Sequence, residues 1–198
     1  MADKDTDFER EAKLNEVYLD IILRYKELIE EKEHLSVSEL PTLVTPKSNL
    51  VAKEIERIKS SFGIYNYNSD FFEASVQCFS FVKNEIGDLT LPIQFWLTPD
   101  DTIRFRLGDL LDRNILLCSM LLALGNPSSK VFVAIKGSIR VIFTYYEFED
   151  HTYVLDILKD EIKLVTKVRD FIHGIGLDEK DGDTTVYEFN DKVYLDVV

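Results

Sequence analysis

Hydrophobic residues recur at helical spacing through the first half of the chain. Steps of three and four predict amphipathic helices over three ranges, 6–33, 48–62 and 70–86. A loop from 34 to 47 separates the first two, and an irregular stretch from 87 to 107 follows the third. The first half of the chain is therefore predicted to be mainly helical.

The best-defined helix begins after Asp109, a residue type that favours the N-cap position. Asp112 adds negative charge close to the positive end of the helix dipole. The residues from 115 to 124 are apolar almost all round the helix, and Gly125 then suits a C-terminal cap. This pattern predicts a central, buried helix.

Beyond residue 130 the hydrophobic period changes to two, which is typical of strands. Strands are expected at 130–136, 139–148 and 152–158, a short helix at 165–173, and a closing hairpin at 184–189 and 192–197. Helices followed by an antiparallel sheet indicate an α+β fold, with the sheet packed on the buried helix. We divide the chain into an N-terminal helical extension and linker, 1–47, and a domain, 48–198.

The charge balance excludes several classes of partner. The chain has 198 residues, of which 36 are acidic and 23 basic, so its formal net charge is −13. Such a surface repels phosphate backbones, and we therefore expect no nucleic-acid partner. No apolar run approaches the roughly 18 residues that span a membrane, and the polar, acidic N-terminus is unlike a targeting peptide. We expect a cytoplasmic protein that does not associate with membranes.

Common catalytic and metal-binding motifs are absent from the sequence. Cys78 and Cys118 are too few for a disulfide framework or a cysteine-rich metal site, and we expect both in the core. His34, His151 and His173 stand apart, without the spacing of metal ligands. There is also no glycine-rich phosphate loop. We therefore expect neither a metal nor a cofactor.

Two short motifs stand before the buried helix. Pro99-Asp100-Asp101-Thr102 precedes Gly108-Asp109-Leu110-Leu111-Asp112, and the helix ends in Ala123-Leu124-Gly125. This order resembles the transglutaminase-like superfamily, which has the papain-like cysteine protease fold. The family pattern is Pro, an acid and Thr, then Gly-Asp-Cys-x-Asp opening a buried helix that ends in Ala-Leu-Gly. The resemblance runs from about residue 70 to 159, about half the chain.

The resemblance also implies where catalytic residues would stand. In the family, a cysteine in the first helical turn attacks, a histidine on a neighbouring strand takes its proton, and an aspartate orients the histidine. Leu110 stands at the cysteine position, and Asp156 matches the aspartate. Counting back from Asp156 places Arg140 at the histidine position, or Ile139 or Val141 with a slip of one residue. Leucine cannot attack and arginine stays protonated, so the resemblance implies a degenerate member in which Arg140 pairs with Asp156.

Other residues have two interpretations. Gln94 and Trp96 would line the former substrate cleft together with Asp109 and Asp112. Alternatively, Gln94 and Trp96 form a loop anchor that covers the core, which is the interpretation we favour. The predicted function is a catalytically inactive module that binds a protein or peptide, or acts as a scaffold. The alternative is a peptidase or amidase that uses carboxylates near Asp109, Asp112 and Asp156 instead of a thiol. A third possibility is a structural protein that self-associates through its first helix, so the oligomeric state stays open.

Overall fold

A computed structural model of the chain describes residues 17–20, 23, 37–89, 96–174 and 184–196. The chain forms two compact units, one of residues 1–36 and 93–95 and the other of residues 37–92 and 96–198. In the first unit, residues 17–20 and 23 are helical, and the rest of the helix predicted at 6–33 lies outside the described residues. The description below concerns the second unit.

The helices of the second unit follow from the hydrophobic pattern at most positions. The predicted helices at 48–62 and 70–86 are confirmed, as is the buried helix after Asp109. A short helix inside the supposedly irregular stretch 87–107 was missed. The helical segments are η1 (Val37–Leu43, a 3-10 helix), α2 (Asn49–Ser60), α3 (Tyr67–Glu85), α4 (Pro99–Phe105), α5 (Leu110–Ala123) and α6 (Val168–Gly174).

The strands form a six-stranded antiparallel sheet in the order β6-β5-β4-β3-β7-β8. A pair of two-residue strands, β1 (Gly87–Asp88) and β2 (Leu107–Gly108), forms a separate parallel ladder. The strands of the sheet are β3 (Lys130–Lys136), β4 (Ile139–Phe148), β5 (His151–Asp156), β6 (Glu161–Val165), β7 (Thr184–Phe189) and β8 (Tyr194–Asp196). The predicted α+β fold is therefore confirmed, and β6 is a strand that the sequence pattern did not predict.

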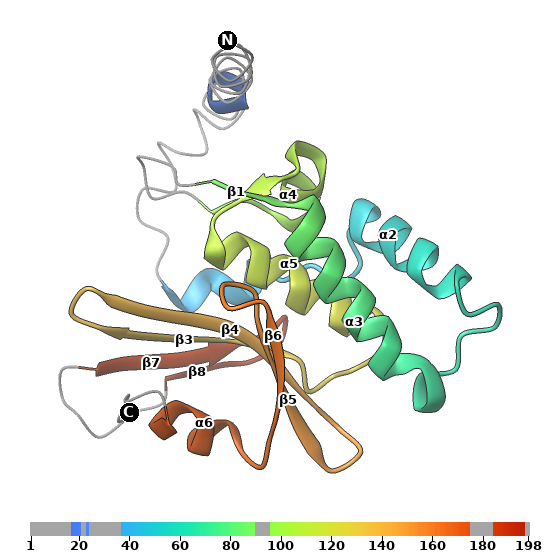
Figure 1. Ribbon diagram of the computed structural model, residues 1–198. Helices are drawn as coiled ribbons and strands as arrows, with labels where there is room; N and C mark the ends of the chain where they lie inside the picture. Colours follow the sequence, from blue (N-terminus) through green and yellow to red (C-terminus); the bar gives the residue numbers. More distant parts are fainter. Residues whose placement is uncertain (1–16, 21–22, 24–36, 90–95, 175–183, 197–198) are drawn as a thin grey trace, which may run out of the picture. The chain divides into compact units, whose positions relative to one another are not determined.

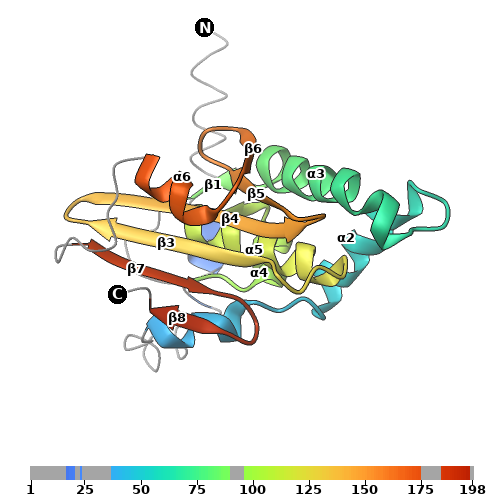
Figure 2. The ribbon, with the colours of Figure 1, turned by 90° about the horizontal axis from the view of Figure 1, so that it is seen from below.

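Helix α5 lies on one face of the sheet and helix α6 lies on the other (Figure 1). Figure 2, seen from below, shows the face that carries α6. Thr144 of β4 bonds to Asn114 of α5, so even-numbered positions at this part of β4 face α5. Phe143 instead packs edge-on against Phe171 of α6, with ring centroids 5.3 Å apart. Side chains alternate along a strand, so one face of β4 serves the α5 side and the other serves the α6 side.

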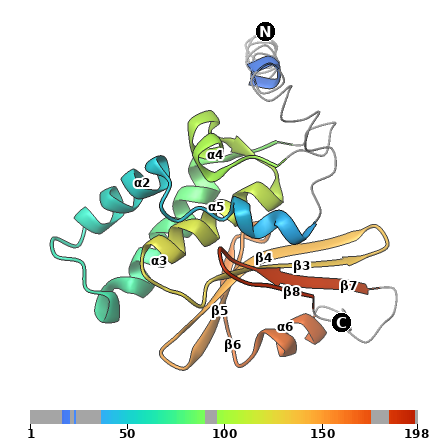
Figure 3. The ribbon, with the colours of Figure 1, turned by 180° about the vertical axis from the view of Figure 1, so that it is seen from behind.

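The core beside α5 begins earlier in the chain than the expected domain boundary. Leu40, Leu43 and Val44 are buried, and they cluster with residues of α5, β3 and β7. Figure 3 shows η1 next to α5 and the sheet. That residues 48–198 fold independently stays a prediction. In the structure, the packing of this unit already includes η1. Among the helices of the described residues, none is both long and apolar enough to cross a membrane.

Candidate functional site

Leu110 is the first residue of α5, so the position that the family resemblance assigns to a cysteine lies in the first turn of a buried helix. The predicted N-cap is confirmed: Asp109 Oδ1 accepts a hydrogen bond from the amide of Asp112 at 2.8 Å. Asp112 Oδ2 accepts from the amide of Asp109 at 3.1 Å. This reciprocal capping box satisfies two amide donors that the helix itself leaves free, and it fixes where Leu110 stands.

Glycine at position 108 lets the chain pass close to this turn. A Cβ atom on Gly108 would lie 3.0 Å from the Cβ of Asp112 and 3.1 Å from the Cγ2 of Thr102. Both contacts are tighter than ordinary van der Waals contact. The Gly-Asp step of the motif therefore has a packing role in this chain, whatever residue follows it.

Asp112 also ties the segment before α4 to the helix. Its Oδ1 accepts a hydrogen bond from the amide of Leu97 at 2.8 Å, and the residue is 1% exposed. Burial raises the pKa of Asp112 well above its ordinary value, and repulsion from Asp109 adds to this, against the hydrogen bonds from Leu97 and Asp109. Burial likewise raises the pKa of Asp109. Both carboxyl groups are thus engaged in holding the backbone.

The expected cleft residues have different outcomes. Trp96 is half-buried and packs against a cluster that includes Leu40 and Leu111, as expected of a loop anchor. Gln94 lies outside the described residues. That Trp96, Asp109 and Asp112 line a substrate cleft stays a prediction.

Both thiols lie in the core, as predicted. Cys78 in α3 and Cys118 in α5 are 0% exposed and unpaired. Burial raises the pKa of each thiol far above its ordinary value, so neither forms a thiolate near neutral pH. The helix position that favours a thiolate is occupied by Leu110, and the two available thiols are elsewhere.

The expected pair between Arg140 and Asp156 is wrong. In the antiparallel register of β4 and β5, Thr144 lies opposite Leu155. The next residue of β5, Asp156, is therefore level with position 143 of β4 rather than with position 140. Arg140 is exposed and pairs with Ile135 of β3 at the far end of the hairpin. Counting residues along the sequence from Asp156 to Arg140 therefore did not give the residue that lies opposite Asp156 in the sheet.

Asp156 also lies on the face of the sheet away from α5. Its neighbour Leu155 belongs to the core cluster of α3 and α5, so the alternation turns Asp156 toward α6. Its carboxylate accepts hydrogen bonds from the amides of Leu158 and Lys159, at 3.1 and 3.0 Å, and pairs with Lys159 Nζ at 3.1 Å. Asp156 therefore fixes the turn into β6, and the structure does not bring it together with Leu110.

The polar side chain that β4 presents to the first turns of α5 is Thr144, which the sequence analysis missed. Its Oγ1 donates to Asn114 Oδ1 at 2.9 Å, and Asn114 Nδ2 donates to the carbonyl oxygen of Leu110 at 2.8 Å. Both residues are fully buried. The signal in the sequence was a lone asparagine within an apolar helix, because a buried amide needs a partner. A threonine hydroxyl does not accept a proton near neutral pH, so this pair braces the helix on the sheet.

Among the residues that the structure describes, the remaining ionisable groups do not come together at the first turn of α5. His151, the first residue of β5, and His173 in α6 are exposed, and His34 lies outside the described residues. Asp109 and Asp112 stand at α5 while Asp156 is on the opposite face, so the three acids of the alternative hydrolase do not converge. Within the described residues, no three His, Cys, Asp or Glu side chains form a group that could hold a metal ion.

No family model matches the chain, and no curated protein matches its sequence. Similarity to solved structures is found. EGTA-treated LapG of Legionella pneumophila has a TM-score of 0.51 and 18% identity, and the match covers 82% of this chain and 86% of that one. A candidate cysteine protease from Cytophaga hutchinsonii has a TM-score of 0.45 and 14% identity, over 82% of this chain and 55% of that one. The likeness to LapG confirms the expected α+β fold of helices followed by an antiparallel sheet, and at 18% identity it shows the fold alone.

Proposed function

We propose that this chain is a binding or scaffolding module with a LapG-like fold and without thiol chemistry. One observation carries the proposal: the first turn of α5 holds Leu110, whose side chain has no nucleophilic atom. The resemblance places the attacking cysteine of the family at this position. A fold that keeps the frame of such a site but not its nucleophile is suited to recognising a protein or peptide rather than cleaving one.

The surroundings of Leu110 support the same proposal. Cys118 lies in the apolar interior, and ionising it there would cost far more than at a helix N-terminus. Asp109 and Asp112 use their oxygens on backbone amides of the capping box and of Leu97. The carboxylate hydrolase therefore has no observation in its favour, and we propose no second function.

The absence of chemistry is tested with activated acyl esters, amides and peptides of varied sequence. The folded chain should hydrolyse or transfer none of them above the background rate, and alkylation with iodoacetamide should change nothing. Turnover that is lost on alkylation would contradict the proposal. Turnover that survives alkylation but is lost with EDTA would favour the carboxylate alternative instead.

A substitution sharpens this test. Leu110→Cys should give a thiol that reacts with a labelling reagent but does not turn over substrate, because the polar residue facing α5 from β4 is Thr144 and not a base. Leu122→Cys, at a half-exposed position near the other end of α5, is the matched control. Multiple turnover by Leu110→Cys alone would show that a proton acceptor is in place.

The binding function needs its own experiment. Selection from a random peptide library should enrich related sequences on the folded chain and not on the heat-unfolded chain. Failure to enrich any sequence, with the chain shown to be folded by circular dichroism, would contradict the module proposal even if no activity is found.

A further inference from the structure

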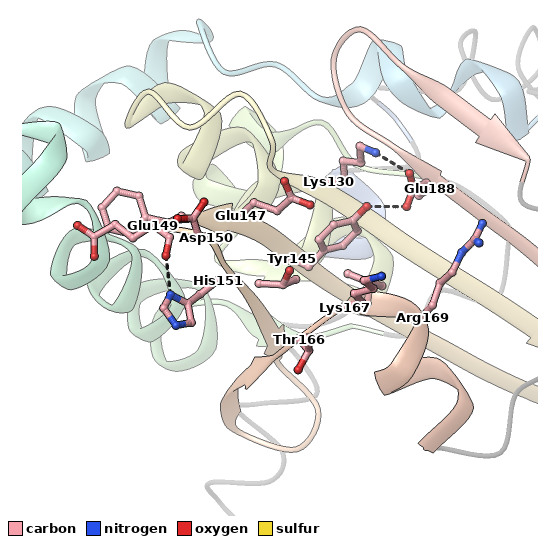
Figure 4. Close-up of a pocket in the computed structure, with 13 residues that line it drawn as sticks. Lys130, Tyr145, Glu147, Glu149, Asp150, His151, Thr166, Lys167, Arg169 and Glu188 are labelled. Atoms are coloured by element: carbon pink, nitrogen blue, oxygen red, sulfur yellow. Dashed lines mark hydrogen bonds and ion pairs between the residues drawn. The ribbon is translucent and has the colours of Figure 1, made fainter.

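A polar groove of about 720 Å³ lies on the α6 face of the sheet, away from Leu110. Its floor comes from β3, β4 and β7, one wall from the end of β4 and the turn into β5, and the other from the start of α6 (Figure 4). None of the residues predicted from the family resemblance lines it. It is therefore a separate surface from the one that the family resemblance suggests.

The floor of the groove is polar but internally satisfied. Glu188 Oε1 accepts from Lys130 Nζ and its Oε2 accepts from Tyr145 Oη, each at 2.5 Å. Burial and the bond to Glu188 raise the pKa of Tyr145, so its hydroxyl remains a donor. Lys130 and Glu188 also neutralise each other. The floor thus has a fixed shape and little net charge to offer a ligand.

The two walls, in contrast, carry opposite charges that are not paired. Glu147, Glu149 and Asp150 are exposed on the β4–β5 wall, and Lys167 is exposed on the wall beside α6. Within the described part of the chain, none of these four side chains has an ion-pair partner at 4.0 Å or less. The charges of Glu147, Glu149 and Asp150 on one wall and of Lys167 on the other therefore do not form ion pairs with each other.

We infer that this groove binds a peptide segment with separated charges, its basic part against Glu147, Glu149 and Asp150 and its acidic part against Lys167. A ligand of one sign would be attracted by one wall and repelled by the other. A peptide also supplies backbone groups that can bond to the hydroxyls of Thr152 and Thr166 at the groove. The choice of a peptide rests on the proposed binding function, whereas the position of the groove and its charge pattern do not.

The test uses the full chain and three short blocked peptides of equal length. One has lysines at one end and glutamates at the other, one has only lysines as charged residues, and one only glutamates. Calorimetric titration at low salt should show the mixed peptide binding about fivefold more tightly than either of the others. Added salt should weaken it, because exposed charges are screened.

Charge reversal at one wall should exchange the preference. Lys167→Glu makes both walls acidic, so the mixed peptide should bind about tenfold more weakly and the lysine peptide should become the best ligand. Lys53→Glu is the matched control, because Lys53 is exposed on α2, across the sheet, and the net charge changes equally. In Lys53→Glu the order of the three peptides should not change.

Equal binding of the three peptides, or the same change of preference in Lys53→Glu, would overturn the inference. So would tightest binding of the lysine peptide to the unmodified chain, because attraction to the net negative charge would then explain it. These results are distinguishable from failure of the proposed function. Catalytic turnover together with the predicted peptide preference would contradict the proposed function but support the groove as a peptide site. Enrichment of library peptides whose binding does not change in Lys167→Glu would support the proposed function but contradict the groove as the binding site.

Discussion

The first turn of α5 and the groove beside α6 lie on opposite faces of one sheet, and they use their polar groups differently. At α5, Asp109 and Asp112 bond to backbone amides, and Asn114 bonds to Thr144. At the groove, the floor is satisfied but the walls leave carboxylates and Lys167 exposed, without ion pairs among the described residues. The first region has its polar groups committed to the fold, and the second has charges available to a ligand.

This difference indicates which residues of the chain suit a test of stability and which suit a test of binding. Polar groups that are buried and paired stabilise the structure, and their loss destabilises it. Exposed, unpaired charges across a groove contribute little to stability, so they can be changed to test binding. Stability measurements should therefore respond strongly at α5 and weakly at the charged residues on the other side.

The largest effect is expected from Asp112→Ala. This variant removes the acceptor for the amides of Leu97 and Asp109, and it leaves the buried Leu97 donor unpaired. We expect the free energy of unfolding to fall by about 3 kcal/mol, from the lost cap and the unpaired amide together. Urea unfolding measures it. Glu73→Ala, an exposed carboxylate on α3, should change stability by less than about 0.5 kcal/mol. Equal effects of the two variants would remove the contrast.

The same carboxyl group makes stability depend on pH. Its pKa is raised in the folded chain, so above its ordinary value of 3.8 the folded chain holds a proton that the unfolded chain has lost. The free energy of unfolding therefore decreases as the pH rises from there to the raised pKa. Asp112→Asn lacks this titration. The variant should gain stability relative to the unmodified chain as pH rises from about 4 to 7, measured by urea unfolding at several pH values. A relative loss over that range would show that the pKa of Asp112 is lowered by folding.

A smaller loss is expected from Thr144→Val. The substitution keeps the size of the side chain but leaves the Oδ1 of the fully buried Asn114 without its hydroxyl donor. We expect a loss of about 2 kcal/mol. Thr185→Val, at an exposed position of β7, is the control and should stay within about 0.5 kcal/mol. If Thr144→Val and Thr185→Val change the free energy of unfolding equally in thermal or urea unfolding, the hydrogen bond between Thr144 and Asn114 does not stabilise the fold.

Much of the fold could be predicted from local patterns. The Asp109 cap and the apolar run after it identified α5, and alternating residues identified β3 and β4. The helix α4 was missed because it has only seven residues, and Pro99 looked like a helix breaker although it stands at a position where proline fits. Strand β6 was missed because it has only five residues at the sheet edge, although the alternation of charged and apolar residues from 161 to 164 is a signal that could have found it.

The site could be predicted only in part, because its two halves depend on different kinds of information. The position of Leu110 follows from the helix cap at Asp109, which can be recognised from adjacent residues in the sequence. The position of Asp156 depends on the register between β4 and β5, and a shift of one residue turns a side chain to the other face. Counting residues back from Asp156 to Arg140 therefore could not establish that they face each other. The charged groove was not predicted either, since it joins β3, β7 and the start of α6.

The smallest effect tests this corrected register. Arg140 is exposed and far along β4 from Asp156, so Arg140→Ala should cost less than about 0.5 kcal/mol. Asp156→Asn loses the ion pair with Lys159, whose side chain is half exposed, and should cost about 0.5–1 kcal/mol. The double variant should equal the sum of the two within about 0.5 kcal/mol. Asp156→Asn combined with Lys159→Ala should instead cost less than its sum, because both changes break one contact. If the Arg140 and Asp156 substitutions instead have non-additive effects on the free energy of urea unfolding, the two residues interact, and the register that excludes their pair is contradicted.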